Sequence, residues 1–466
     1  MEHSFRRVLL GGATVLVALS ATQAGAQSIE EALAAAYRGN PQLLSEQARL
    51  RATDEGVPRA LSNWRPTVTV SGTGGKGTDT IRQDTSAGDI KTDVNRTPYS
   101  AQLSVTQPVY RGGRTEAEIN RSENLVQRGR AQLQSAEQLV LLDAATAYTN
   151  LLRDQAVLEL NINNEQVLRR QLEAAQDRFN VGEITRTDVA QAESRLARAQ
   201  ADRIQAEGNL TSSRATYLRV IGQQPGRLVQ PRLPPNLPPN ETVAVKAAAD
   251  NPNVISARFA ERAAVDDVEL IFGEKLPTVQ LQGNVGRSHE TQTRGLERDV
   301  AEALVVVSVP IYQAGQTDAR VREAKQTASQ RHIEVEDAAR RAREDATRGY
   351  EGLNTARAAI VAFESQVRAA QIALEGVEQE ARVGSRTVLD VLDAEQELFN
   401  AKVNLVRAQR DEIVAAYQLT SAVGNLTARN LSLPVEIYDP TIYYNRTRGR
   451  WYGTDIGEER QGSRTE

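Results

Sequence analysis

The sequence has no cysteine and few of the side chains that build catalytic or metal sites. Without cysteine there is no disulfide, no thiol chemistry, no cysteine-based metal site and no lipid anchor on an N-terminal cysteine. The three histidines, His3, His289 and His332, are far apart in the sequence. Since no nucleophile–base set and no cluster of metal ligands is visible, we predict a protein that is not an enzyme, with no cofactor and no structural metal.

Aromatic residues are also scarce. They make up 4% of the 466 residues, and the initiator is the single methionine. A conventional globular core of this size would use more of both, whereas an alanine-rich and charge-rich chain is typical of long helices packed side by side. The formal net charge is only −4, so there is no electrostatic reason to expect a nucleic acid partner.

Long apolar runs are absent after the first 26 residues. Residues 1–26 have the pattern of an export signal, with basic Arg6-Arg7, an apolar stretch over Val8–Ala21 and small residues before Gln27. A membrane anchor is the alternative, but this stretch is short for a span. No later stretch approaches the ~20 apolar residues of a membrane helix. If the exported chain spans a membrane, it must therefore do so as a β-barrel.

What the sequence does contain is an internal repeat. Phe179–Leu196 (FNVGEITRTDVAQAESRL) has a near-copy in Ala381–Leu398 (ARVGSRTVLDVLDAEQEL). In each copy a helical pattern breaks at a glycine and restarts at Thr-x-x-Asp, which is the spacing of a capping box. We interpret residues 181–188 and 383–390 as the turns of two long helical hairpins.

The repeat extends over most of the chain. Three further pairs of segments match: Asn40-Pro41 with Asn251-Pro252, Pro66-Thr67-Val68 with Pro277-Thr278-Val279, and Pro108-Val109-Tyr110 with Pro310-Ile311-Tyr312. We therefore divide the chain into a first repeat, 27–223, a proline-rich linker, 224–240, and a second repeat, 241–424. The tail, 425–466, is polar and irregular in pattern and carries Tyr438, Tyr443, Tyr444, Trp451 and Tyr452. We expect it to pack against the helices and to be disordered after about Gly457.

Each repeat has the same predicted order of elements. A short helix is restarted at Asn-Pro, and two strands follow, within about 66–110 and about 277–312. Polar loops around Ile81–Arg96 and His289–Arg298 join the strands of each pair. The strand segments alternate polar and apolar residues over about ten positions, the length of a tilted barrel strand. A soluble hairpin with one face on a core would show the same alternation.

A long helix follows each strand pair. Thr115–Val181 contains no proline, and as one helix its 67 residues would measure ~100 Å at 1.5 Å per residue. The return helix after each turn is about half as long and ends near Gly222 or Gly424. Stacked end to end with the Asn-Pro helix, it nearly matches the long helix. We therefore expect a rod about two helices wide that carries a strand pair.

These features together resemble the TolC family of outer-membrane channel-tunnels. The resemblance is carried by the paired turns VGEITRTDV and VGSRTVLDVLDA, by the Asn-Pro restarts, and by QPVYRGG paired with VPIYQAG. It implies a mostly α fold with a membrane β-barrel, built as a homotrimer with a 12-stranded barrel in the outer membrane and an α-helical tunnel through the periplasm. Four strands cannot close a barrel alone, so oligomerisation is also required on physical grounds.

The resemblance also implies a function. The chain would be the outer-membrane exit duct of a tripartite efflux pump or a type I secretion system, exporting small toxic molecules, proteins or both. Its partners would be a periplasmic adaptor, an inner-membrane pump or ABC transporter, and outer-membrane lipid. The residues alone leave one alternative, an exported coiled-coil structural or adhesive surface protein without a pore. The duplicated strand pairs argue against it.

The second turn carries the candidate selectivity residues. Asp390 and Asp393 share a helix face at i and i+3, and the resemblance makes them two acidic rings at the periplasmic entrance. Such rings would favour cations and bind blocking divalent ions. Asp390 is equally well explained as a helix cap whose negative charge interacts favourably with the helix dipole.

The resemblance also assigns a gate latch and an adaptor contact. Arg386, Asp188 and Thr387 match positions that hold the entrance closed, although an exposed ion pair there would be worth under ~1 kcal/mol. Ala381 stands where a similar family member has tyrosine, so part of this latch is missing or replaced, with Arg382 the candidate replacement. The adaptor would contact the tips of the two turns: Val181, Gly182, Val383, Gly384 and Ser385.

Overall fold

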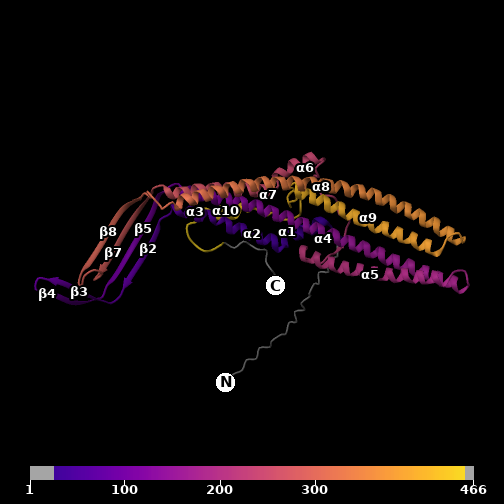
Figure 1. Cartoon of the computed structure of the whole chain (residues 1–466), viewed down its shortest axis with the longest axis horizontal. Coiled ribbons are helices and arrows are strands. Elements are labelled where there is room, and N and C mark those ends of the chain that lie inside the picture. The colour runs from indigo at the N-terminus through magenta and orange to yellow at the C-terminus, as the bar shows by residue number, and fades with distance from the viewer. Residues whose placement is uncertain (1–25, 457–466) are drawn as a thin grey trace, which may run out of the picture.

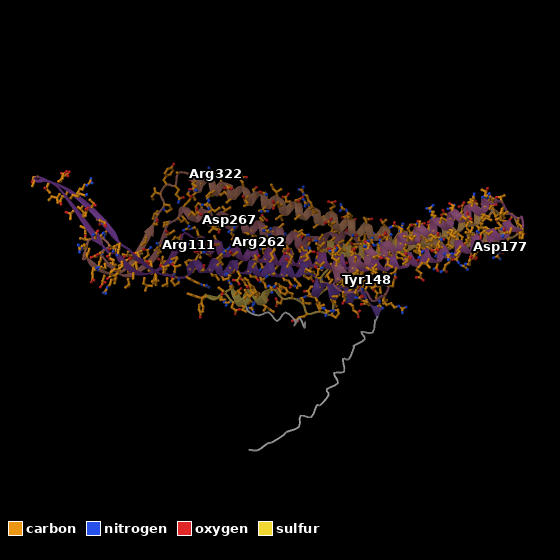
Figure 2. The ribbon with its side chains drawn as sticks, turned by 90° about the horizontal axis from the view of Figure 1, so that it is seen from below. Arg111, Tyr148, Asp177, Arg262, Asp267 and Arg322 are labelled. Carbon is orange, nitrogen blue, oxygen red and sulfur yellow. The ribbon has the colours of Figure 1, made fainter. Side chains whose placement is uncertain are left out.

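The computed structural model describes residues 26–456, which form one elongated molecule (Figure 1). The predicted export signal and the expected disorder after Gly457 fall outside these residues, apart from Ala26 at the predicted cleavage site. A helical rod joins a β-sheet at one end. In Figure 2, Arg111 marks this junction, Tyr148 lies midway along the rod, and Asp177 lies near the far end.

The two halves of the chain have parallel sets of elements. The first half contains β1 (Ala26–Gln27), α1 (Ile29–Gly39), α2 (Pro41–Asp54), α3 (Gly56–Leu61), β2 (Thr67–Gly74), β3 (Gly77–Thr85), β4 (Gly88–Arg96), β5 (Tyr99–Arg111), α4 (Arg114–Asn180) and α5 (Arg186–Ile221). The linker and second half contain β6 (Arg227–Leu228), α6 (Glu241–Ala247), α7 (Pro252–Phe272), β7 (Thr278–His289), β8 (Glu297–Ser308), α8 (Gln316–Arg382) and α9 (Val388–Ala422). The tail adds α10 (Pro440–Thr447).

The two long helices are confirmed. Helices α4 and α8 are each 67 residues long, and each packs along its return helix, α5 or α9. Both begin directly after a glycine with positive φ, Gly113 or Gly315, a conformation that residues with a Cβ rarely adopt. Among the described residues, no helix combines the length and the apolar character that crossing a membrane requires.

Two asparagines hold the shorter helices end to end. Asn40 caps α2 through its side-chain oxygen, while its Nδ2 donates to the carbonyl of Val220 at the end of α5 (3.1 Å). Asn251 does the same for α7, donating to the carbonyl of Ala422 at the end of α9 (2.9 Å). Each amide thus serves two helix ends at once. This joint produces the predicted stack of two short helices beside each long one.

The four longer strands form one antiparallel sheet in the order β2-β5-β7-β8. Its register collects most of the apolar side chains on one face, because residues two apart in a strand point the same way. That face contains Val68, Val70, Leu103, Val105, Val279, Leu281, Val285, Val305 and Val307. On the opposite face, Asn284 is bonded to Gln102, Ser104 and Glu302. The sheet therefore has an apolar side and a hydrogen-bonded polar side.

The segment Ile81–Arg96 is not a loop, and that prediction was wrong. Strands β3 and β4 form a second hairpin, which continues outward from β2 and β5 (Figure 1). Its polar residues pair across the strands: Thr78 bonds Asn95, and Thr80 bonds Asp93, at 2.7 and 2.6 Å. Polar composition suggested a loop, but threonine favours strands and these cross-strand pairs supply hydrogen bonds.

The largest core lies midway along the rod. It joins α1, α2, α4, α5 and α9 with the tail, and the ring of Tyr148 is fully buried in it. The Tyr148 hydroxyl lies 2.8 Å from the Gln27 carbonyl oxygen and accepts a hydrogen bond from Val229 N, so it fastens the short β1–β6 pair to the rod.

The tail is more ordered than its polar sequence predicted. It packs against the rod as expected, but it contains α10, whose Tyr443 is buried and donates to Glu55 at the end of α2. Asp439 caps this helix and Pro440 occupies its first turn, a start signal that the sequence contained.

Candidate functional site at the hairpin turns

The turns at the far end of the rod have the same backbone geometry. Gly182 and Gly384 adopt φ of 82° and 80°, which allows the chain to reverse directly after α4 and α8. The next residue then donates to a carbonyl of the last helical turn: Glu183 N to Arg178 O (2.9 Å) and Ser385 N to Glu380 O (3.0 Å). A glycine is needed at both positions because left-handed φ is strained for other residues.

Both predicted capping boxes are confirmed. Thr185 and Asp188 exchange hydrogen bonds at the start of α5, and Thr387 and Asp390 do so at the start of α9. Asp390 Oδ2 accepts from Thr387 N (2.9 Å) and Thr387 Oγ1 (2.8 Å). Because these bonds favour the charged form, the pKa values of Asp390 and Asp188 lie below the ordinary value. Both carboxylates are therefore ionised across the neutral pH range.

The proposed latch residues are not brought together within one chain. Asp188 is bonded in its own capping box, and Arg386 Nε donates to Glu380 Oε2 (2.8 Å) at the end of α8. The first turn has a similar pair with reversed polarity, Arg178 with Glu183 (3.1 Å). Sequence reasoning missed Glu380, Arg178 and Glu183, although opposite charges on the two sides of a glycine turn were a usable signal.

Asp393 connects the two hairpins. Its Oδ1 lies 2.5 Å from Arg195 Nη2 on α5, so the carboxylate bridges α9 to the first half of the chain. Both side chains remain partly open to solvent, with 57% of the Asp393 side chain exposed. Sequence spacing could not identify this pair, because 198 residues separate the partners.

Apolar packing supports this bridge. Leu392, next to Asp393, is 1% exposed and packs among Leu168 and Ala175 of α4 and Ala192 of α5. One leucine of the second hairpin is thus seated in the first. The arrangement fixes the direction in which Asp393 and Asp390 leave the helix.

The tips themselves carry exposed apolar side chains. Val181 is 72% exposed and Val383 is 80% exposed, and each precedes the turn glycine. Exposed valines at the end of a charged rod are suited to contact with another protein.

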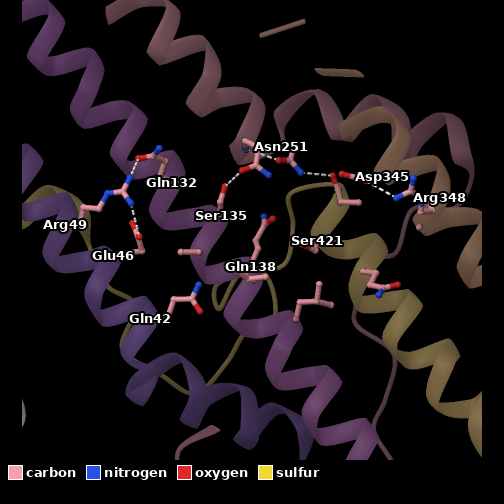
Figure 3. A pocket seen from close by; sticks show the side chains of 17 residues that line it. Gln42, Glu46, Arg49, Gln132, Ser135, Gln138, Asn251, Asp345, Arg348 and Ser421 are labelled. Atoms are coloured by element: carbon pink, nitrogen blue, oxygen red, sulfur yellow. Dashed lines mark hydrogen bonds and ion pairs between the residues drawn. The ribbon is translucent and has the colours of Figure 1, made fainter. Parts of the chain in front are cut away.

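A hollow lies in the middle of the rod, where α2, α4, α7, α8 and α9 converge (Figure 3). It has a volume of about 640 Å³ and a largely polar lining. Several of its polar groups are paired with one another: Arg49 bonds Glu46 and Gln132, and Ser135 bonds Asn253, while Nε2 of buried Gln138 has no hydrogen-bond partner among the described residues. This pairing explains the hollow as a packing junction between the two halves.

The described part of one chain contains no group of side chains suited to hold a metal ion. Within residues 26–456, no three histidine, aspartate or glutamate side chains are grouped to hold an ion. Binding of a divalent ion at Asp390 and Asp393 would therefore need carboxylates from several copies.

Comparison with solved structures identifies the fold. The outer membrane protein VceC from Vibrio cholerae has a TM-score of 0.74 to this chain at 19% identity, covering 85% of this chain and 96% of that one. The outer membrane channel CmeC from Campylobacter jejuni gives a TM-score of 0.76 at 13% identity, covering 90% and 89%. The fold is therefore the mostly helical, internally repeated fold of these outer-membrane proteins.

Comparison of sequences goes further. The family model described as "Outer membrane efflux protein" matches residues 29–223 and 243–425. The outer membrane efflux protein BepC of Brucella suis is 33% identical over 96% of this chain and 95% of that protein. The alkaline protease secretion protein AprF of Pseudomonas aeruginosa is 28% identical over 79% of this chain and 78% of that protein.

These relatives are components of efflux and secretion systems, and none supports an adhesive protein without a pore. The chain belongs to the outer membrane efflux protein family. Its members are outer-membrane transport channels that extend into the periplasm, and it is not a family of enzymes.

Proposed function

We propose that three copies of this chain form the exit duct of a tripartite efflux pump or a type I secretion system. The single observation that carries the proposal is the four-stranded sheet with one apolar face and two open edges, β2 and β8. Strand edges left open in lipid would expose unpaired N–H and C=O groups at several kcal/mol each. Joining β8 of one copy to β2 of the next removes every edge, and three copies give a 12-stranded barrel.

The exposed apolar side chains support the same assembly. Val70 on β2 is 79% exposed and Val305 on β8 is 67% exposed; both lie on the apolar face, one on each edge strand. In the barrel this face contacts lipid, and the face around Asn284 lines a water-filled lumen. The long hairpins of the three copies then enclose a tunnel through the periplasm.

The turns at the far end of the rod would meet the other components. Val181, Gly182, Val383, Gly384 and Ser385 would contact a periplasmic adaptor, which connects the duct to an inner-membrane pump or ABC transporter. Their exposure and their distance from the sheet support this role. The relatives named for efflux and for protease secretion leave both small molecules and proteins as substrates.

In the closed state, bonds between neighbouring copies would involve Arg386, Thr387 and Asp188. Arg386 would exchange its bond to Glu380 for a carboxylate of the adjacent turn, in the way a guanidinium fork suits a carboxylate. Each exposed bond is weak, under ~1 kcal/mol, so a latch of this kind opens readily when the adaptor binds. Ala381 packs beside Val391 and Leu374, so it contributes an apolar contact where the family's tyrosine would add a hydroxyl.

Asp390 and Asp393 would form two acidic rings at the entrance, with three carboxylates in each. Asp390 is ionised because its capping bonds lower its pKa. Six negative charges in a narrow opening would favour cations and bind divalent ions that block the passage.

Cross-linking tests the trimer. The chain lacks cysteine, so Val70→Cys on β2 and Val305→Cys on β8 would be the only thiols in two separately tagged chains. When both chains are expressed together in the outer membrane, a short bismaleimide should link Val70→Cys of one tag to Val305→Cys of the other. Chains carrying Ile333→Cys on the rod provide the control for random collision. Monomers alone after cross-linking would contradict the joined edges.

A further inference from the structure

The described part of the tail ends in a small folded loop, Arg450–Ile456, near the junction of rod and sheet. Arg450 organises it: Nε donates to the carbonyl of Tyr452 (3.2 Å), and Nη1 donates to the carbonyl of Asp455. Arg446 on α10 donates to the carbonyl of Ile456 (2.9 Å) and holds the other end. The loop is thus a defined structure, closed by two arginines.

Arg65 mounts this loop at the base of the sheet. Its guanidinium lies 4.8 Å from the ring centre of Trp451, and its Nη1 donates to the carbonyl of Arg450 (2.6 Å). Arg65 is two residues before β2, and the apolar face of the sheet begins at Val68. At 3.3 Å per residue, the backbone of Arg65 therefore lies about 10 Å before Val68, and Trp451 stacks on the guanidinium of Arg65.

The loop presents large side chains to its surroundings. Trp451 is 66% exposed, Tyr452 91% and Ile456 74%. In a chain with only two tryptophans, one of them is placed at this exposed position. Tryptophan and tyrosine have an apolar body and a polar end, and they are enriched where a membrane meets water.

The charge of the segment matches the same surroundings. Residues 446–456 contain three arginines, Arg446, Arg448 and Arg450, against one acidic residue, Asp455. Arg448 is paired with Glu123 (2.8 Å), whereas Arg446 and Arg450 donate to neutral carbonyls of the loop. Phosphate groups of lipid headgroups would complement these charges.

We propose that the Arg450–Ile456 loop is an interfacial anchor, in which Trp451 and Tyr452 insert into the phospholipid headgroup region of the inner leaflet of the outer membrane. Three such loops around the barrel base would set how deep the sheet lies and resist axial movement of the duct. The inference rests on the proposed insertion of the sheet in that membrane. The exposed side chains could instead contact a protein partner, and the test separates contact with lipid from contact with protein.

Tryptophan fluorescence provides this test, because the chain has only Trp64 and Trp451. Full-length protein carrying Trp64→Phe would be reconstituted in vesicles of phosphatidylethanolamine and phosphatidylglycerol. Separate preparations would contain lipids with a nitroxide quencher on the headgroup or deep in the acyl chain. Two further variants place the single tryptophan elsewhere, in a Trp64→Phe/Trp451→Phe background: Leu281→Trp on the apolar face of β7, and Val361→Trp on the rod.

We expect the headgroup quencher to reduce Trp451 emission at least about twofold more than the deep quencher does. Leu281→Trp should show the opposite order, and Val361→Trp should respond to neither. Arg65→Ala, which removes the mount of the loop, should weaken quenching of Trp451 without changing that of Leu281→Trp.

The outcomes separate the anchor from the function on which it rests. If Leu281→Trp is quenched and Trp451 is not, the sheet is inserted and the anchor is wrong; the loop then faces water or a protein partner. If neither is quenched in a folded protein, the insertion of the sheet fails and the anchor fails with it.

Discussion

Asp54 is a buried carboxyl group whose charge the fold does not compensate well. It is fully buried at the end of α2, and neither carboxylate oxygen has a hydrogen-bond partner among the described residues. Burial raises the pKa of Asp54 to about 6, against the opposing influence of Arg130. In the tail, burial raises the pKa of Tyr438, and the charge of Asp54 raises it further. Docking of the tail should therefore depend on pH.

The direction follows from linkage. The pKa of Asp54 in the folded state lies above its ordinary value of 3.8, so the folded state binds the proton more tightly. The local stability around Asp54 should be highest below pH ~4 and should fall as pH rises from ~4 to ~6. The total loss should be at most ~3 kcal/mol, and the stability should stay low at higher pH. Hydrogen–deuterium exchange of α2 and α10, corrected for intrinsic rates, measures this. Asp54→Asn should keep the strong protection at every pH, and an unchanged pH dependence in that variant would assign the effect to another group.

The entrance residues differ in how far the sequence could predict them. Thr387 and Asp390 were predictable because a capping box depends on residues three apart. Arg195 was not, because its contact with Asp393 depends on how two hairpins pack. Asp393 now has two explanations, a bridge between hairpins and a charge at the entrance. Half of its side chain is open to solvent, so the two roles are compatible.

At the scale of elements, the asparagine joints should be the sensitive points of the rod. Asn251→Asp keeps the oxygen that caps α7 but replaces the donor to the Ala422 carbonyl with a carboxylate oxygen. We expect destabilisation of about 1–3 kcal/mol, because one hydrogen bond is lost and two oxygens are opposed. Urea-induced unfolding, followed by helix circular dichroism, measures it.

Asn240 provides the matched control. Its side chain caps α6 by accepting from Val243 N, and Asn240→Asp preserves that bond. This variant should be nearly neutral, since aspartate and asparagine cap equally well. Equal losses in the two variants would mean that the joint to α9 contributes nothing beyond the cap.

The sequence predicted elements well where the signal was local. Glycine turns and long proline-free runs located both ends of α4 and α8 to within one residue, and Asn-Pro located the starts of α2 and α7. It failed at β3 and β4, where polar residues resembled a loop although Thr78 and Thr80 pair with Asn95 and Asp93. Strand pairing is non-local, and composition alone does not contain it.

At the scale of the whole molecule, the sheet and the turns lie at opposite ends of the rod (Figure 1). One end has an apolar face with open edges, and the other has carboxylates and exposed valines. The repeat explains both ends, because each half supplies two long strands and one hairpin. A continuous passage between the ends is the central claim, and it requires several copies of the chain.

Single-channel conductance in a planar bilayer tests that claim most directly. Purified wild type would be compared with Asp390→Asn/Asp393→Asn, and with Asp439→Asn as a loss of charge far from the turns, each with and without divalent cations. We expect small, cation-selective channels that divalent ions block from one side in wild type and Asp439→Asn. The block should be lost in the double variant. If conductance and block are unchanged in the double variant, the duct stands and both aspartates have structural roles only. If a well-folded trimer shows no conductance, even with Arg386→Ala at the latch, the duct itself is contradicted.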